Sequence, residues 1–177
     1  MTTPPAKLLV FAREHLVCIK IVGRANVGSS IDFKRLVQEL LGKDLSCFVL
    51  DLSECVLMDS TFLGVLAGFG LKINDPGTVG REDRSIELLN PNLRVSELLE
   101  NLGVAHLFKL RQNGAAPQPN GTGQVEFPAT VSSREEVTRN CLEAHQTLMR
   151  LCPENASKFK DVTQFLSEDL VKLKAAH

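Results

Sequence analysis

Tryptophan and tyrosine are absent from the 177-residue sequence, and its only aromatic residues are nine phenylalanines. The rings that commonly stack on single-stranded nucleic acid are therefore reduced to phenylalanine. An excess of one charge is also missing, since 20 Lys and Arg stand against 21 Asp and Glu, without a basic block. Proteins that bind nucleic acid or an acidic membrane surface usually carry such a block. The sequence thus argues against both kinds of partner.

Long apolar runs are missing as well. No stretch approaches the roughly 18 apolar residues of a membrane span, and residues 1–5 lack the basic start and apolar core of a signal peptide. The five cysteines are widely spaced, with no C-x-x-C pair and no His/Cys pattern typical of zinc. We therefore expect reduced thiols, no metal site and a cytoplasmic location.

Strand-like and helix-like segments alternate over the first two thirds of the chain. Residues 8–23 predict two strands split by the polar turn 13–15, and such a short connection favours antiparallel pairing. Residues 47–52 form an almost continuous apolar run, typical of a central strand covered on both faces. Further strands are predicted at 85–90 and 107–110. This order predicts an α/β fold whose sheet is mixed but mostly parallel, with an antiparallel first strand and helices packed on it.

Three helices are predicted between these strands. Ser29 or Ser30 has the residue type of an N-cap for a helix that ends at Gly42. Pro91 is predicted to open a later helix. Between them, the uncharged segment 62–71 is too short to span a membrane and too apolar for a free surface helix. It must pack on the sheet or lend one face to a partner.

Gly64 and Gly68 lie four residues apart in this apolar segment, so one stripe of the helix is nearly flat. In a soluble chain, this spacing more often reflects close approach of a helix to a sheet than dimerisation. We expect helix–sheet approach here, with dimerisation as the alternative.

The composition changes at residues 112–130, which are rich in Gly, Pro, Gln and Asn, carry one charge and predict a flexible linker. Beyond it, Ser133 and Glu136 have the spacing of a capping box. Two apolar stripes interrupted by Pro153 then predict a helical hairpin over 131–177. A hairpin of this size has too small a core of its own, so we expect it to dock on the rest of the chain or to mediate self-association.

The best candidate site is Asp59-Ser60-Thr61, where a buried strand gives way to the apolar helix. A hydroxyl there lies at a helix N-terminus, whose unpaired N–H groups and dipole favour an oxyanion. A phosphate on Ser60 would add about −1.5 to −2 charges beside Asp59 and an apolar surface, which amounts to a switch. The alternative, which the local chemistry alone favours, is that Ser60 is simply the N-cap.

Catalytic alternatives find little support in the sequence. No motif links His15, His106, His145 or His177 to Ser60, and no G-x-S-x-G elbow is present. We interpret His145 as a partly buried helix residue and not as a phosphorelay histidine. The acidic residues are scattered without a paired acid–base arrangement. We expect no enzymatic activity and no cofactor.

Residues 58–66, MDSTFLGVL, resemble the signature of STAS domains, a family named after sulphate transporters and anti-sigma-factor antagonists. Residues 23–26, GRAN, resemble the family's Gly-x-(small/Leu)-Asp turn before the first helix. Downstream, residues 95–99 and 103–108 resemble its last helix and strand. The resemblance implies a STAS domain over 6–111, followed by the linker and the hairpin.

In bacterial anti-sigma-factor antagonists of this family, a serine kinase that is also the anti-sigma factor phosphorylates the serine after the motif aspartate. The unmodified antagonist captures that kinase and frees a sigma factor, and a metal-dependent phosphatase reverses the modification. The resemblance thus implies that Ser60 is the phosphoacceptor of a partner-switching protein. Supporting or partner-binding roles are implied for Asn26, Asp59, Thr61, Phe62 and Leu63.

Asn26 departs from the family pattern, which has an aspartate at this position. In kinase-regulated members that carboxylate lies close to the phosphoacceptor and contributes to partner recognition. Asparagine keeps the shape and a hydrogen-bonding group but loses the charge. The alternative interpretation is therefore a STAS domain without phosphorylation, acting as a scaffold or small-ligand-binding module in a sensing or transport assembly.

Overall fold

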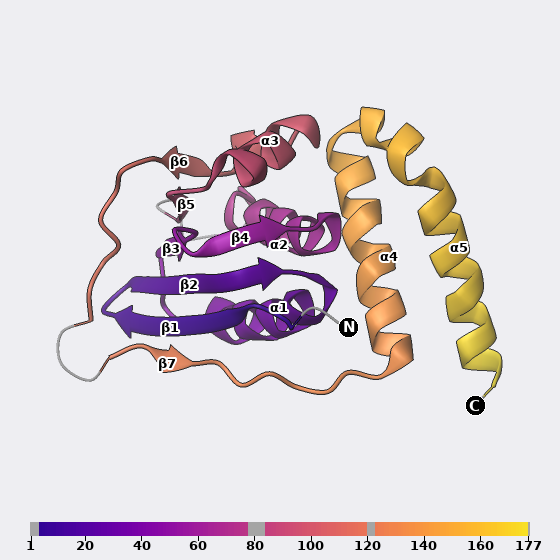
Figure 1. Ribbon diagram of the computed structural model, residues 1–177, viewed down its shortest axis with the longest axis horizontal. Helices are drawn as coiled ribbons and strands as arrows, with labels where there is room; N and C mark the ends of the chain where they lie inside the picture. The colour runs from indigo at the N-terminus through magenta and orange to yellow at the C-terminus, as the bar shows by residue number, and fades with distance from the viewer. Residues whose placement is uncertain (1–3, 78–83, 120–122, 177) are drawn as a thin grey trace.

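The structure is a computed structural model that describes residues 4–77, 84–119 and 123–176 (Figure 1). Its strands form one seven-stranded sheet in the order β6-β5-β3-β2-β1-β7, with β4 paired to β2. Strand β1 is antiparallel to β2 and β7, and the other pairs are parallel. The predicted α/β fold with a mostly parallel sheet is confirmed. The strands are β1 (Lys7–Arg13), β2 (Leu16–Ala25), β3 (Cys47–Asp51), β4 (Cys55–Met58), β5 (Ser85–Leu89), β6 (Lys109–Arg111) and β7 (Val125–Glu126).

Five α-helices complete the described part of the chain. They are α1 (Val27–Leu41), α2 (Ser60–Ile73), α3 (Leu93–Asn101), α4 (Arg134–Leu151) and α5 (Ala156–Ala175). Figure 1 shows α1 and α2 behind the sheet, α4 crossing beside the ends of the strands and helices, and α5 as the outermost element. None of the described helices is long and apolar enough to cross a membrane.

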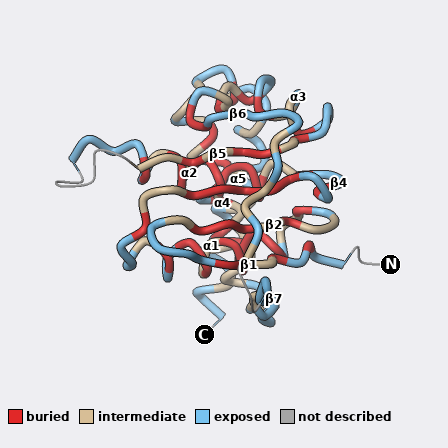
Figure 2. The backbone as a smooth tube through the Cα atoms, turned by 90° about the vertical axis from the view of Figure 1, so that its left-hand side faces the viewer, coloured by how far each residue is buried: buried red, intermediate tan, exposed pale blue. Residues whose placement is uncertain are grey.

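Side chains alternate across the central strands, as the pleat of a β-sheet requires. Val17 and Ile19 of β2 belong to the main core, which α1 and α2 cover. On the other face, Cys18 and Val49 form a smaller cluster against which Ala116 packs. The buried strands run through the middle of the molecule in Figure 2. Strand β3 is thus covered on both faces, as its apolar run predicts.

Two helix starts differ from those expected. Asn26, and not Ser29 or Ser30, caps α1, because its Oδ1 accepts the Ser29 N–H at 3.2 Å while Ser29 Oγ accepts the Asn26 N–H at 2.9 Å. This reciprocal capping box leaves Ser29 inside the first turn. Asn92 caps α3, so that helix begins two residues after Pro91.

Two short strands, β4 and β7, are not predicted by the sequence pattern, and β6 begins later than predicted. Strand β4 has four residues, of which Val56 and Leu57 are exposed, so it carries little apolar signal. Strand β7 has two residues and pairs with β1 inside the segment 112–130, of which residues 120–122 lie outside the described chain. The strand expected at 107–110 begins at Lys109, because a 3-10 turn precedes it.

Helix α2 is buried on two sides. Its Phe62 and Leu66 belong to the main core, while Gly64 faces α4. A Cβ added at Gly64 would collide with the backbone carbonyl of Ala144. The flat glycine stripe therefore serves helix–helix contact within one chain. The predicted helix–sheet approach at this stripe is wrong, because a helix from the C-terminal segment occupies that side of α2.

The C-terminal helices pack as a hairpin on the rest of the chain. Helix α4 contacts α2 and α1, and its fully buried Leu148 belongs to the main core. Helix α5 packs on α4 and contributes no buried residue. The structure therefore shows docking, the first of the two outcomes expected for this hairpin. Self-association stays a prediction.

Candidate functional site

The adjacent ends of β2 and β4 bring together the two sequence motifs of the site, residues 23–26 and the segment that contains Ser60. Strands β2 and β4 are parallel, and Ala25 pairs with Met58, so Asn26 and Asp59 each follow directly on a strand end. The Asp59 N–H donates to the Ala25 carbonyl at 2.9 Å. Asp59 caps α2, since its Oδ1 accepts the Phe62 N–H at 2.8 Å. The N-termini of α1 and α2 thus lie side by side. The side chain of Asn26 caps α1, and the side chain of Asp59 caps α2.

The Asp59 carboxyl is partly buried at this junction. Burial raises the pKa of this carboxyl above the ordinary 3.8. Hydrogen bonds from the backbone N–H groups of Phe62, Val27 and Thr61 lower the pKa, as does the electrostatic effect of the nearby His145, but burial has the larger effect. Because it interacts with both α1 and α2, this side chain ties the two helix starts together. Its protonation state is therefore linked to folding.

Substitution of Asp59 by asparagine is expected to change the pH dependence of stability. Between pH 3.8 and the raised pKa, the folded chain keeps a proton that the unfolded chain has lost, so the contribution of Asp59 to the free energy of unfolding falls as pH rises. Asparagine preserves the cap without titrating. Denaturant unfolding from pH 3 to 7 should show Asp59→Asn gaining stability relative to wild type with rising pH. A constant or declining difference would contradict this.

Ser60 is the first residue of α2 and takes no part in its cap. The prediction that Ser60 is the N-cap is wrong, because Asp59 fills that position. Its Oγ instead lies 2.9 Å from Nε2 of His145, on α4. A hydroxyl that the sequence leaves without a partner is thus held by a residue 85 positions away.

The ring of His145 is fixed by its other neighbours. Nδ1 lies 2.7 Å from the carbonyl oxygen of Cys141. A carbonyl can only accept, so Nδ1 carries the hydrogen, and in the neutral ring Nε2 accepts the hydroxyl hydrogen of Ser60. The ring packs edge-on against Phe159 of α5, with 4.8 Å between centroids. His145 is buried in a helix, as expected, but its contact with Ser60 has no sequence signal.

The remaining predicted site residues lie inside the molecule. Thr61 is buried, and its Oγ1 lies 3.8 Å from the sulfur of Cys141. Phe62 and Leu63 are fully buried in the main core. These three side chains hold α2 in place from within, so any support they give to Ser60 acts through the position of the helix.

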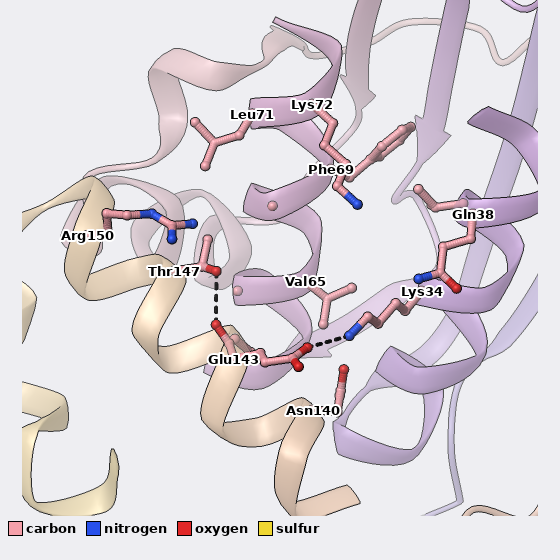
Figure 3. A pocket seen from close by; sticks show the side chains of 14 residues that line it. Lys34, Gln38, Val65, Phe69, Leu71, Lys72, Asn140, Glu143, Thr147 and Arg150 are labelled. Atoms are coloured by element: carbon pink, nitrogen blue, oxygen red, sulfur yellow. Dashed lines mark hydrogen bonds and ion pairs between the residues drawn. The ribbon is translucent and has the colours of Figure 1, made fainter. Parts of the chain in front are cut away.

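The pair of Ser60 and His145 is an incomplete nucleophilic arrangement. In a catalytic triad an acidic group orients the histidine, whereas here a backbone carbonyl occupies Nδ1. A cavity of about 450 Å³ lies between α1, α2 and α4, and neither residue of the pair lines it (Figure 3). Among the described residues, no group of three or more His, Cys, Asp or Glu side chains is placed to hold a metal ion.

Comparisons with known proteins agree with this fold. A family model described as "STAS domain" matches residues 9–116, which end before β7, α4 and α5. A solved structure of the anti-sigma factor antagonist SpoIIAA in its unphosphorylated form is 15% identical, with a TM-score of 0.51, and covers 62% of this chain and 89% of that one. An anti-sigma factor antagonist from Mycobacterium paratuberculosis is 14% identical, with a TM-score of 0.52 and the same coverage. No curated protein matched. At these identities the two structures establish the fold alone.

Proposed function

We propose that this chain, which belongs to the STAS domain family, is an anti-sigma-factor antagonist controlled by phosphorylation of Ser60. Unphosphorylated, it binds an anti-sigma factor that is also a serine kinase, and phosphorylation of Ser60 releases that partner. A metal-dependent phosphatase restores the binding form. The chain is a non-catalytic binding module of the bacterial cytoplasm. The observation that carries the proposal is a serine at the first position of α2 whose hydroxyl is not used by the helix cap.

The local electrostatics support a switch at this position. The N-terminus of α2 offers N–H groups and a positive dipole end to an added phosphate. Asp59 already takes the Phe62 N–H and carries its own carboxylate next to the modified residue. A phosphate on Ser60 therefore concentrates negative charge on a chain whose formal net charge is only −1. Such a local change is well suited to breaking a protein–protein contact.

Phosphorylation should fall on Ser60 when the protein is incubated with a native cell extract and Mg-ATP. Peptide mass spectrometry is expected to find phosphate on residue 60 in wild type and in Thr61→Ala, and none in Ser60→Ala. Ser60→Ala should retain affinity for the kinase, whereas Ser60→Asp should weaken it about a hundredfold, since an uncompensated charge at a desolvated contact costs several kcal/mol. Undiminished phosphorylation of Ser60→Ala would refute the site.

The second candidate function is a STAS scaffold or small-ligand-binding module without phosphorylation. Asn26 favours it, because the site lacks the carboxylate that kinase-regulated members carry there. The same experiment separates the two functions. Partner binding that is indifferent to Ser60→Asp supports the scaffold.

A further inference from the structure

We infer that α4 is the resident occupant of a helix-docking surface on α2 and α1, and that it shields Ser60, which is only partly exposed, so that a partner gains full access to this serine when α4 leaves. Binding of a kinase or anti-sigma factor to the surface that α4 leaves rests on the proposed function. The covering of this surface by α4, called the cover below, rests on the contacts of α4 alone.

The surface under α4 is a stripe of small side chains on α2. Ser60, Gly64 and Gly68 follow one another at intervals of four residues and so share one face of the helix. Gly64 admits the backbone of Ala144, and Gly68 lies under Thr147. Because His145 follows Ala144 directly, this close approach places its imidazole on the Ser60 hydroxyl. Helix α4 thus flanks Ser60 on this face of α2 and leaves the serine only partly exposed.

Three of the six buried residues of α4 are polar, and the other three are Leu142, Ala144 and Leu148. Asn140 contacts α1 and His145 reaches Ser60 on α2, whereas Thr138 contacts Asp169 of α5. Asn140 Nδ2 donates to Ser30 Oγ at 2.9 Å, but its buried Oδ1 has no hydrogen-bond partner in the described part of the chain. A buried acceptor left without a donor opposes docking, and water would satisfy it once α4 departs. This unpaired acceptor therefore lowers the free energy needed to undock α4.

The other links from α4 to α1 are at the periphery. Lys34 pairs with Glu143, and Arg35 pairs with Glu136, each at 2.6 Å and partly exposed. Exposed ion pairs of this kind contribute little. Figure 3 shows the Lys34–Glu143 pair bridging the cavity between α1 and α4. Helix α4 thus rests closely on α2, and apart from the Asn140–Ser30 hydrogen bond it reaches α1 through these peripheral pairs.

The connection to β7 keeps α4 close even when it is undocked. Residues 127–133 contain no helix or strand, and Thr130 is anchored to Asp32, with Oγ1 to Oδ1 at 2.9 Å. A short tether of this kind gives its segment an effective concentration in the millimolar range. A partner has to compete against that concentration to reach the surface.

The test uses the full-length chain and a matched pair of glycine substitutions. Gly64→Ala forces α4 away from α2, whereas Gly68→Ala adds a methyl group at an ordinary 4.0 Å from Thr147. Both remove a glycine from the same helix and raise its helix propensity equally. Each is combined with Ser60→Cys, and labelling of residue 60 by a maleimide is followed by peptide mass spectrometry. The native thiols of Cys18 and Cys55, both buried, report whether the fold stays closed.

We expect Gly64→Ala to speed labelling of residue 60 about ten- to a hundredfold, the effect of a typical overpacking clash. Gly68→Ala should stay within about twofold, and Cys18 and Cys55 should stay protected. Equal labelling of the two variants would overturn the cover. Should Gly64→Ala also expose Cys18, His145→Ala replaces it, because it removes the imidazole with which α4 shields residue 60 and introduces no clash.

Phosphorylation in the extract separates the cover from the proposed function. Faster modification of Ser60 in Gly64→Ala than in Gly68→Ala supports both. Faster labelling of residue 60 in Gly64→Ala, together with no phosphorylation of either variant, supports the cover and refutes the assignment of Ser60 as a kinase substrate. Equal phosphorylation of wild type and Gly64→Ala overturns the cover, since a kinase would then reach Ser60 beneath docked α4.

Discussion

Replacement of Phe62 by alanine is expected to lower the free energy of unfolding by about 3–5 kcal/mol, the usual cost of deleting a fully buried aromatic ring. Phe62 has no exposed surface, and its ring centroid lies 5.0 Å from that of Phe33. The Phe33 ring in turn contacts Phe69 edge-on at 6.2 Å. Because sheet and helices enclose this cluster, the surroundings have little freedom to close the cavity.

Urea denaturation measures this loss, and the chain offers a matched control. Phe165 on α5 is 65% exposed, so Phe165→Ala makes the same chemical change at a surface position. It should alter stability by no more than about 0.5 kcal/mol. Similar losses in both variants would show that Phe62 is not a core residue. The large expected loss also means that a binding defect in Phe62→Ala would report unfolding and not a lost contact.

Replacement of Leu148 by aspartate is expected to detach α4 and α5 while the sheet stays folded. Leu148 has no exposed surface and belongs to the main core. A buried charge without a partner costs about 3–5 kcal/mol, which directly opposes the docking of α4. Hydrogen exchange should show lost protection in α4 and α5 and retained protection in β2 and β3.

Gln146→Asp is the control for this variant, because residue 146 lies on the exposed side of the same helix. It should leave exchange in α4 unchanged. Simultaneous loss of protection in α4 and β3 of Leu148→Asp would show that the C-terminal helices fold as one unit with the sheet. The same experiment tests the division of the chain into a STAS domain over 6–111, a linker and a hairpin over 131–177, which stays a prediction.

The sheet could be predicted because its signals are local. Alternation in residues 8–23 and the apolar run 47–52 each place a strand without reference to the rest of the chain. The motif around Ser60 likewise depends on adjacent residues. Strand β4 shows the limit of such signals, since its two exposed apolar side chains remove the expected pattern.

The contact between Ser60 and His145 could not be predicted in this way. An amphipathic pattern shows that α4 must dock, but it does not say where. Shape decides the position here, because only a residue without a side chain admits the Ala144 backbone at Gly64. That choice depends on two helices far apart in sequence, and it brings the histidine to the serine as a consequence.

Because α4 belongs to the same polypeptide as the surface it covers, its strength as a competitor does not depend on how much protein a cell makes. A separate inhibitor is diluted when its target is overproduced, whereas the ratio of cover to site is fixed at one to one in every molecule. The affinity that a partner needs is therefore encoded in the residues beneath α4, Gly64 above all. Changes at those few positions would reset the threshold of the response without altering either the abundance of the protein or the chemistry at Ser60.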